Sequence, residues 1–193
     1  MLKYYLEIRL LPTEEISYSF LLTNVFTKIH HALADCSHNG KCPIGVSFPK
    51  MDEKEARVGD VIRLFAESQS TLENLNLDTA FHRYKEYLRM KPIREIRNVK
   101  GYETYSKAHF KDSTSIIRRY ARRKNISIEE SRNLHKLPKH HAKFPYIRLH
   151  SVSTNQDYML LIHRTTYEDP TNGDFSSFGL SRSVTVPVLP VYG

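Results

Sequence analysis

The sequence predicts an α+β protein in two parts: a domain over residues 1–95, and a smaller α/β domain with an arginine-rich helix over residues 96–193. Two observations predict this division. In the first part, segments with the period of a strand alternate with segments with the period of a helix. In the second part the chain becomes strongly basic around one short helix, and its remaining segments are typical of short strands.

The elements of the first part follow one another as strand, helix, strand, strand, helix, strand. Residues 3–11 alternate apolar and polar side chains, as in a half-buried strand, and residues 17–34 repeat apolar side chains at helical spacing. The remaining expected elements are strands at 44–48 and 60–66, a helix near 71–81 and a strand near 84–90. This is the order of a ferredoxin-like (RRM-like) unit, a scaffold common among RNA-binding modules.

The second part opens with residues 98–115, which are polar without a steady period and predict a linker or surface loop. After the arginine-rich helix, Ser127-Ile-Glu-Glu130 forms a capping box, which predicts a second helix to about Leu134. Beyond it, strands are expected over residues 146–151 and 158–164, as a hairpin, and in short pieces of 175–191.

The helix over residues 115–124 separates its charged from its apolar side chains. Successive residues lie about 100° apart around a helix, so its four arginines share one side and Lys124 extends the charge at the end. No carboxylate lies among these ten residues, whereas a solvated helix face usually carries Glu partners. Because guanidinium groups fork onto phosphate oxygens, this face predicts nucleic-acid binding. The arginines are Arg118, Arg119, Arg122 and Arg123.

The positive charge of the chain is concentrated around this helix. The chain has 29 Lys and Arg against 21 Asp and Glu, a net charge of +8. Between Lys107 and Lys143, eleven basic and three acidic residues leave the same net charge of +8. Such a localised basic segment is typical of a polyanion-binding surface. The apolar half of the helix lacks Trp and Phe, so insertion into a membrane is not expected.

The sequence offers little for metal or cofactor chemistry. Its acidic residues form no cluster of the kind that a metal-dependent nuclease needs, so no metal and no cofactor is expected. Cys36 and Cys42 lie in a turn-rich loop whose spacing matches no common zinc motif, which favours a loop insertion with incidental thiols. There is no apolar run of eighteen residues and the N-terminus has a strand pattern, so we expect a soluble cytoplasmic protein.

Histidines and serines remain as candidates for chemistry. His30 follows Phe26 by four residues, at the margin of the buried stripe of its helix. On spacing alone, such a histidine is more often structural or exposed than catalytic. Ser151 and Ser153 stand where the predicted hairpin strand meets its turn, and on spacing alone they are turn residues.

Several segments together resemble one known family, the type I-F CRISPR repeat endoribonucleases. They are Phe26-Thr-Lys-Ile-His-His-Ala-Leu33, Ile44-Gly-Val-Ser-Phe-Pro49, the Arg-Arg-x-x-Arg-Arg helix, Ile126-Ser-Ile-Glu-Glu130, Phe144-Pro-x-Ile-x-Leu-x-Ser-x-Ser-Thr154 and Phe178-Gly-Leu-Ser181. They occur in the family's order over nearly the whole chain, whereas residues 68–105 hardly match. The resemblance implies a ferredoxin-like first domain, a second domain with the arginine helix, and an enzyme that cuts precursor CRISPR RNA beside the repeat hairpin.

The resemblance also implies a metal-independent mechanism. His30 would act on a ribose 2′-OH, which attacks the adjacent phosphate and leaves a 2′,3′-cyclic phosphate and a 5′-OH. Ser151 matches a serine that holds this ribose, and Ser153 would assist it. Phe178 matches the family's C-terminal tyrosine but lacks its hydroxyl, which implies slower cleavage. The catalytic residues so implied are His30, Ser151, Ser153 and Phe178.

For RNA binding, the resemblance implies that the arginine helix lies along the major-groove side of the stem and holds phosphates. An aromatic residue would stack on the terminal base pair, and two residues before the helix would contact purine edges. The enzyme would keep its product hairpin and join the RNA-guided surveillance complex, whose other subunits are then its partners. The residues so implied are Lys107, His109, Arg118, Arg119, Arg122, Arg123, Lys124 and Tyr158.

Two alternatives stay open at this point. A catalytically weak or inactive protein of the same fold would cap the RNA hairpin and bind without cleaving it. A DNA-binding regulator would use the arginine helix and the next helix as a helix-turn-helix, but four adjacent arginines leave no Asn, Gln or Ser for base contacts. Competition between duplex DNA and hairpin RNA separates these alternatives.

Overall fold

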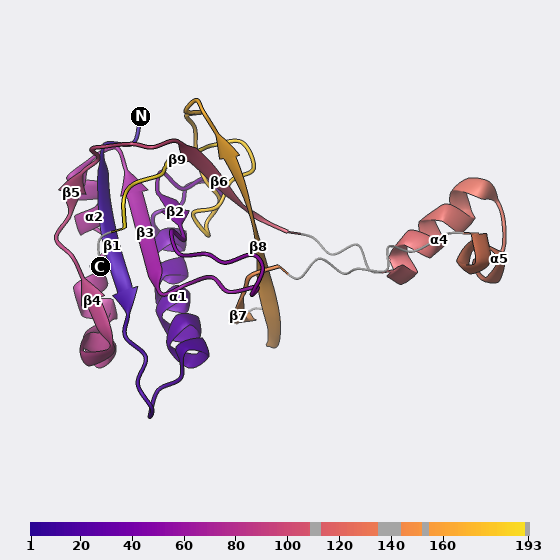
Figure 1. The fold of residues 1–193 in the computed structure, drawn as a ribbon, viewed down its shortest axis with the longest axis horizontal. Helices are drawn as coiled ribbons and strands as arrows, with labels where there is room; N and C mark the ends of the chain where they lie inside the picture. Colours follow the sequence, from indigo (N-terminus) through magenta and orange to yellow (C-terminus); the bar gives the residue numbers. More distant parts are fainter. Residues whose placement is uncertain (109–112, 135–143, 152–154, 192–193) are drawn as a thin grey trace.

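The computed structural model describes residues 1–108, 113–134, 144–151 and 155–191, which form two antiparallel sheets and a separate pair of helices (Figure 1). The helices and strands are β1 (Tyr4–Leu10), α1 (Tyr18–Asp35), β2 (Gly45–Ser47), β3 (Val61–Ala66), α2 (Gln69–Glu73), α3 (Leu77–Ala80), the 3₁₀ helix η1 (His82–Tyr87), β4 (Leu88–Met90), β5 (Arg94–Glu95), β6 (Tyr102–Lys107), α4 (Ser113–Lys124), α5 (Ile128–Leu134), β7 (Tyr146–Ser151), β8 (Gln156–Tyr167) and β9 (Val186–Pro187).

The first sheet has the strand order β2-β3-β1-β4, with β5 also paired to β1. Its pairs are antiparallel, in agreement with the predicted succession of strands and helices. Helix α1 begins at Ser17, whose hydroxyl accepts a hydrogen bond from the Phe20 N–H, as an N-cap residue does. The apolar stripe predicted for this helix is buried in the core.

The second sheet has the order β7-β8-β6-β9 and contains the predicted hairpin, with the register Ser151 opposite Gln156. One cluster of buried apolar side chains joins it to the first sheet, and it includes Phe26 from α1, Tyr105 from β6 and Leu160 from β8. Helix α1 therefore packs against the second sheet as well as the first, which places its residues beside both.

Strand β6 shows that the linker predicted over residues 98–115 was wrong. Its sequence lacks a clean apolar alternation, yet the strand pairs with β8 along its length and with β9 at its start, and Thr104 and Tyr105 are both buried. The Tyr105 hydroxyl donates to the Glu103 carboxylate at 2.6 Å and lies 3.3 Å from the Phe48 carbonyl oxygen. Tertiary pairing thus overrides a weak local pattern.

Two other expected elements differ from the structure. The helix predicted near residues 71–81 is divided into α2 and α3, because Asn76 adopts a left-handed conformation with φ 48°. The strand predicted near residues 84–90 is reduced to β4, since the 3₁₀ helix η1 takes up the preceding residues.

A buried ion-pair network attaches the end of the chain to the first sheet. Arg63 and Lys91 each lie 2.7 Å from the Glu7 carboxylate, and Arg63 also donates to the carbonyl oxygens of Leu189 and Pro190. Burial raises the pKa of Glu7, but Lys91 and Arg63 outweigh burial and hold the pKa below its ordinary value. The C-terminal segment is thereby fixed across this sheet.

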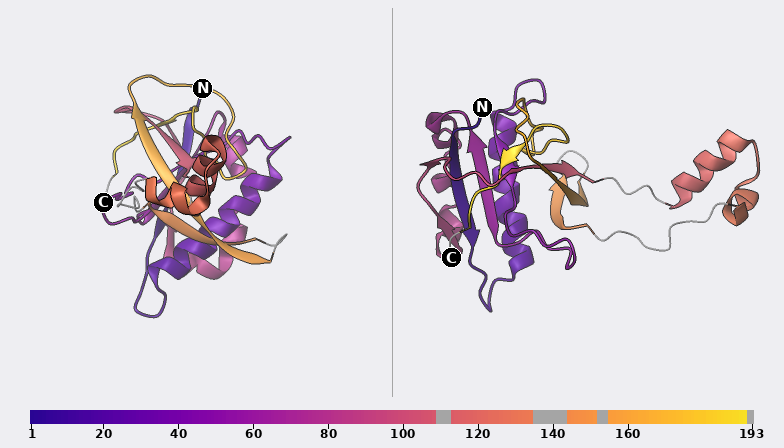
Figure 2. Two further views of the ribbon diagram at one scale, coloured as in Figure 1. Left: turned by 90° about the vertical axis from the view of Figure 1, so that its right-hand side faces the viewer. Right: turned by 45° about the horizontal axis from the view of Figure 1, so that its top comes forward.

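Helices α4 and α5, here called the arginine arm (residues 113–134), lie apart from the two sheets, as Figure 1 and the right-hand view of Figure 2 show. They pack on each other: Ile117 and Ala121 are buried, and the Ser131 hydroxyl donates to the Ile117 carbonyl oxygen at 2.9 Å. The Ser127 hydroxyl accepts from the Glu130 N–H at 3.0 Å, which confirms the predicted helix start.

Candidate functional site

The His30 ring forms the centre of a small cluster between α1 and the C-terminal segment. It is half-buried and stacks on the Phe178 ring, with 3.8 Å between the ring centroids and 4° between the planes. Its Nδ1 lies 3.0 Å from the Ser177 carbonyl oxygen. A carbonyl oxygen only accepts, so Nδ1 carries the hydrogen, and in the neutral imidazole Nε2 then keeps its lone pair.

The surroundings of His30 favour this neutral form. Burial of the ring is the main cause that lowers its pKa below the ordinary 6.5, and the neighbouring His31 lowers it further. The hydrogen bond to the Ser177 carbonyl raises the pKa of His30, but this effect does not outweigh that of burial. At neutral pH the cluster therefore holds an imidazole that can accept a proton at Nε2.

The turn that carries Ser177 and Phe178 explains the glycine of the Phe-Gly-Leu-Ser segment. Gly179 has φ +69°, and an added Cβ would lie 2.3 Å from Cγ2 of Val46. The Gly179 carbonyl also accepts from the Val46 N–H at 2.8 Å, so the turn lies directly against β2. Only glycine combines this conformation with this close approach.

Three further candidate residues, Ser151, Tyr158 and Lys107, lie on one face of the second sheet. The register pairs Leu149 with Tyr158 and Lys107 with Ile162. Because side chains alternate along a strand, Ser151, Tyr158 and Lys107 share the face of the buried Leu149 and Ile162. Strand β7 contacts α1, the helix of His30, so this face is turned toward the His30 helix.

Within this face, Lys107 and Tyr158 interact directly. The Lys107 ammonium lies 5.8 Å from the centroid of the Tyr158 ring, in a cation–π contact. Partial burial raises the pKa of Tyr158, so its hydroxyl stays protonated at neutral pH. The pair presents an aromatic surface beside a positive charge, a combination that is suited to stacked bases and phosphates.

The arginine side chains are exposed on α4, as the sequence predicted. The Arg123 guanidinium lies 5.6 Å from the Tyr120 ring centroid. Among the residues that the structure describes, no carboxylate forms an ion pair with the cations of α4. Their charge is therefore available to an external polyanion. The exposed cations are Arg118, Arg119, Arg122, Arg123 and Lys124.

The sequence did not predict one group that contacts His30, and two of the predicted site residues are not among those that the structure describes. The Ser177 main-chain carbonyl contacts His30, but a carbonyl group leaves no signature in a sequence. His109 and Ser153 lie outside the described residues.

Other features of the described residues carry less chemistry. No group of three or more His, Cys, Asp or Glu side chains among them is placed to hold a metal ion, and none of their helices is long and apolar enough to cross a membrane. Burial raises the pKa of the free thiols Cys36 and Cys42, which keeps them protonated at neutral pH.

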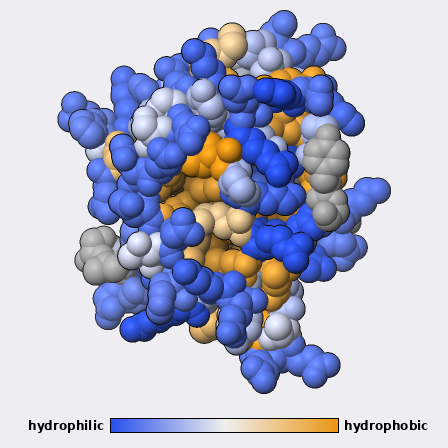
Figure 3. Space-filling view, turned by 90° about the vertical axis from the view of Figure 1, so that its left-hand side faces the viewer, coloured by the Kyte–Doolittle hydropathy of each residue, from blue (hydrophilic) through white to orange (hydrophobic). Residues whose placement is uncertain are grey.

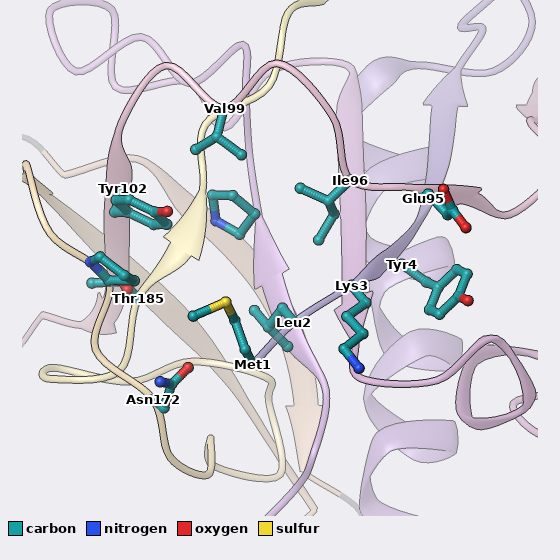
Figure 4. Close-up of a pocket in the computed structure, with 12 residues that line it drawn as sticks. Met1, Leu2, Lys3, Tyr4, Glu95, Ile96, Val99, Tyr102, Asn172 and Thr185 are labelled. Carbon is teal, nitrogen blue, oxygen red and sulfur yellow. The ribbon is translucent and has the colours of Figure 1, made fainter.

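A cavity of about 390 Å³ beside the start of β1 is lined by residues such as Leu2, Ile96 and Tyr102 (Figure 4). The surface on the side opposite the arginine arm is hydrophilic around an apolar hollow (Figure 3). The described lining of the β1 cavity includes none of the candidate site residues.

Comparison with known proteins gives consistent results. The profile of the family described as "CRISPR-associated protein (Cas_Csy4)" matches residues 5–189. Two relatives are each named "CRISPR-associated endonuclease Cas6/Csy4". That of Escherichia coli (strain UTI89 / UPEC) is 30% identical over 187 residues, and that of Pseudomonas aeruginosa (strain UCBPP-PA14) is 31% identical over 189 residues. In both cases the alignment covers 95% of this chain and 98% of the relative.

A solved structure described as "An RAMP protein binding different RNA substrates" aligns over 98% of this chain and 100% of that chain. Its TM-score of 0.35 and identity of 12% are too low to establish a shared fold. The family match and the two relatives confirm the resemblance seen in the sequence, and the chain belongs to the CRISPR-associated Cas_Csy4 family.

Proposed function

We propose that this protein is an endoribonuclease that binds the repeat hairpin of precursor CRISPR RNA and cleaves it at the base of the stem. The relatives in its family are named endonucleases, which supports the activity. The observation that carries the proposal is the His30 cluster, because a neutral imidazole with a fixed Nδ1 hydrogen and an accepting Nε2 is suited to remove a proton.

The reaction requires one proton transfer at His30. Nε2 takes the proton of a ribose 2′-OH, the 2′-oxygen forms a bond to the adjacent phosphorus, and the bond to the 5′-oxygen breaks. The leaving 5′-oxygen takes up a proton from water and the imidazolium later returns its proton to the solvent, so the products are a 2′,3′-cyclic phosphate and a 5′-OH. The imidazolium that forms keeps its Nδ1–H bond to the Ser177 carbonyl, and side chains do this proton transfer without a metal.

Other residues hold the RNA. The Ser151 hydroxyl, on the same sheet face as Tyr158, would hold the nucleophilic ribose, with Ser153 assisting. The Tyr158 ring would stack on the terminal base pair beside the Lys107 ammonium. The arginine arm, with His109 ahead of it, would contact the stem and hold phosphates with its exposed cations.

The organisation of the chain fits this role. The strand order and antiparallel pairs of the first sheet support a ferredoxin-like domain over residues 1–95, with the RNA-binding half over residues 96–193. We propose that the protein retains its cleaved hairpin and acts as a subunit of the RNA-guided surveillance complex, because a surface of exposed cations binds a polyanion tightly.

The test is a gel assay of the cognate repeat RNA in EDTA, with wild type and His30→Ala side by side. Cleavage by the wild type to a 2′,3′-cyclic phosphate, lost in His30→Ala while hairpin binding persists, is the expected result. Tight binding without cleavage by the wild type would instead identify a hairpin cap. Phe178→Tyr is then the first variant to examine, because Phe178 stacks on His30 without the family's hydroxyl.

A further inference from the structure

Two groups that contact the His30 ring come from one turn, residues 176–180. Ser177 supplies the carbonyl that accepts from Nδ1, and Phe178 supplies the stacked ring. Phe178 has no hydroxyl, so the main chain provides the hydrogen bond that orients the imidazole. The conformation of this turn therefore determines where Nε2 points.

The ends of the turn are attached to neighbouring segments. Phe175 exchanges two main-chain hydrogen bonds with Cys42, at 2.8 and 2.9 Å, and the Gly179 carbonyl accepts from the Val46 N–H at 2.8 Å. These bonds place the turn against the first sheet. Ser177 and Phe178, which contact His30, lie between these two attachment points. Their positions therefore depend on hydrogen bonds within the turn itself.

Inside the turn, the Ser176 hydroxyl supplies this constraint. Its Oγ accepts from the main-chain N–H of Phe178 at 3.4 Å and of Leu180 at 3.3 Å. The Ser176 carbonyl accepts from the Gly179 N–H at 2.8 Å, and the Ser176 N–H donates to the Leu180 carbonyl at 2.9 Å. The hydroxyl thus connects the residue that stacks on His30 with the residue that closes the turn.

We propose that Ser176 is a positioning residue for RNA cleavage: its hydroxyl holds the turn in which the Ser177 carbonyl and the Phe178 ring orient His30. The inference rests on the proposed function, since it assigns Ser176 a role in the same reaction. Ser176 itself contacts neither His30 nor the reacting atoms, and it acts through the two residues that follow it.

The chain offers a matched control in Ser181. Its Oγ accepts from the main-chain N–H of Ser183 at 3.3 Å and of Val184 at 3.0 Å. Like Ser176, this hydroxyl accepts from two main-chain N–H groups that follow it, and it lies five residues further along, outside the segment that contacts His30. Loss of either hydroxyl removes two comparable hydrogen bonds, so the pair separates a positioning effect from a general loss of stability.

The experiment measures two quantities in wild type, Ser176→Ala, Ser176→Thr and Ser181→Ala. One is the pKa of His30 by NMR titration of the RNA-free protein, and the other is the single-turnover cleavage rate. In Ser176→Ala we expect the pKa to rise toward 6.5, because relief of burial, the main cause of the lowering, exceeds the loss of the Ser177 bond. His31, the titratable neighbour, is unchanged and is followed in the same titration.

Cleavage by Ser176→Ala should fall about tenfold to a hundredfold, since small misplacements of a catalytic group cost this much. Ser176→Thr should retain both properties, and Ser181→Ala should match the wild type. An unchanged pKa and rate in Ser176→Ala, or equal losses in Ser176→Ala and Ser181→Ala, would overturn the inference.

The NMR titration of His30 needs no RNA, so the proposed cleavage activity and the proposed role of Ser176 can be tested separately. If the wild type does not cleave, the proposed function fails whatever the titration shows. If the wild type cleaves and Ser176→Ala titrates and cleaves like it, the positioning role fails and the proposed function stands.

Discussion

The His30 cluster and the arginine arm are built in opposite ways. The cluster is half-buried and joins residues 147 positions apart in the chain, and burial is the main cause that lowers the pKa of His30. The arm is a contiguous, exposed segment whose cations have no carboxylate partner among the described residues. Burial favours a neutral group that can accept a proton, whereas exposure keeps charge available to phosphates. Cleavage at the His30 cluster should therefore depend on pH, whereas RNA binding at the arginine arm should depend on salt.

The largest effect should come from His30→Ala. Loss of the proton acceptor should lower the cleavage rate about 100- to 10,000-fold, the range of general acid–base catalysis, and leave hairpin affinity near that of the wild type. Single-turnover cleavage and a filter-binding titration measure the two quantities. His31→Ala is the control, because His31 is the exposed neighbour on the same helix. Equal losses in the two variants would contradict the role of His30.

A large effect on binding should come from Arg118→Ala combined with Arg122→Ala. Each lost contact with phosphate should weaken binding about tenfold, the strength of a hydrogen bond to a charged group. Each should also reduce the slope of log K against log salt by about 1. Arg97→Ala is the control for net charge, because Arg97 is exposed and pairs with Glu95. An affinity loss in the arm variant with an unchanged salt slope would argue against phosphate contacts.

Cleavage and RNA binding should differ in their dependence on pH. His30 must be neutral to accept a proton, and its pKa is lowered, so the midpoint of the fall in cleavage with decreasing pH should lie below 6.5. Below the lowered pKa the rate should drop about tenfold for each pH unit. Binding at the arginine arm should not change in this range, since guanidinium groups stay charged. A midpoint at or above pH 6.5 would contradict the lowered pKa of the buried imidazole.

A smaller effect is expected at Phe178. Phe178→Leu removes the stacked ring but keeps an apolar side chain, and should lower cleavage about two- to tenfold, the worth of an aromatic pair. Phe178→Tyr keeps the ring and should retain at least the wild-type rate. Affinity for the hairpin should stay constant in both variants. Unchanged cleavage in Phe178→Leu would show that stacking does not help to orient His30.

The elements that could be predicted from the sequence are those that depend on neighbouring residues in the chain. The arginine helix and its capped neighbour are local features, so charge spacing and the Ser127 cap were enough to place them. The long helix with His30 was equally visible as an amphipathic period. Family resemblance, rather than spacing, singled out His30, because nothing local distinguishes it from a structural histidine.

The parts that escaped prediction depend on contacts between distant segments. Strand β6 has no local period and exists because β8 and β9 pair with it. The orienting carbonyl of Ser177 and the hydroxyl of Ser176 belong to a turn whose position is set by β2. Pairings of this kind appear only when the fold brings the segments together.

The most direct test of the division between chemistry and binding is a titration of cleavage against protein concentration. Single-turnover rates would be measured for the arm variant (Arg118→Ala with Arg122→Ala) and for His30→Ala, up to concentrations that saturate the hairpin. The arm variant should need more protein but reach the wild-type rate at saturation, whereas His30→Ala should stay slow at every concentration. A saturated arm variant that remains as slow as His30→Ala would contradict this division, because the arginines would then take part in the chemistry itself.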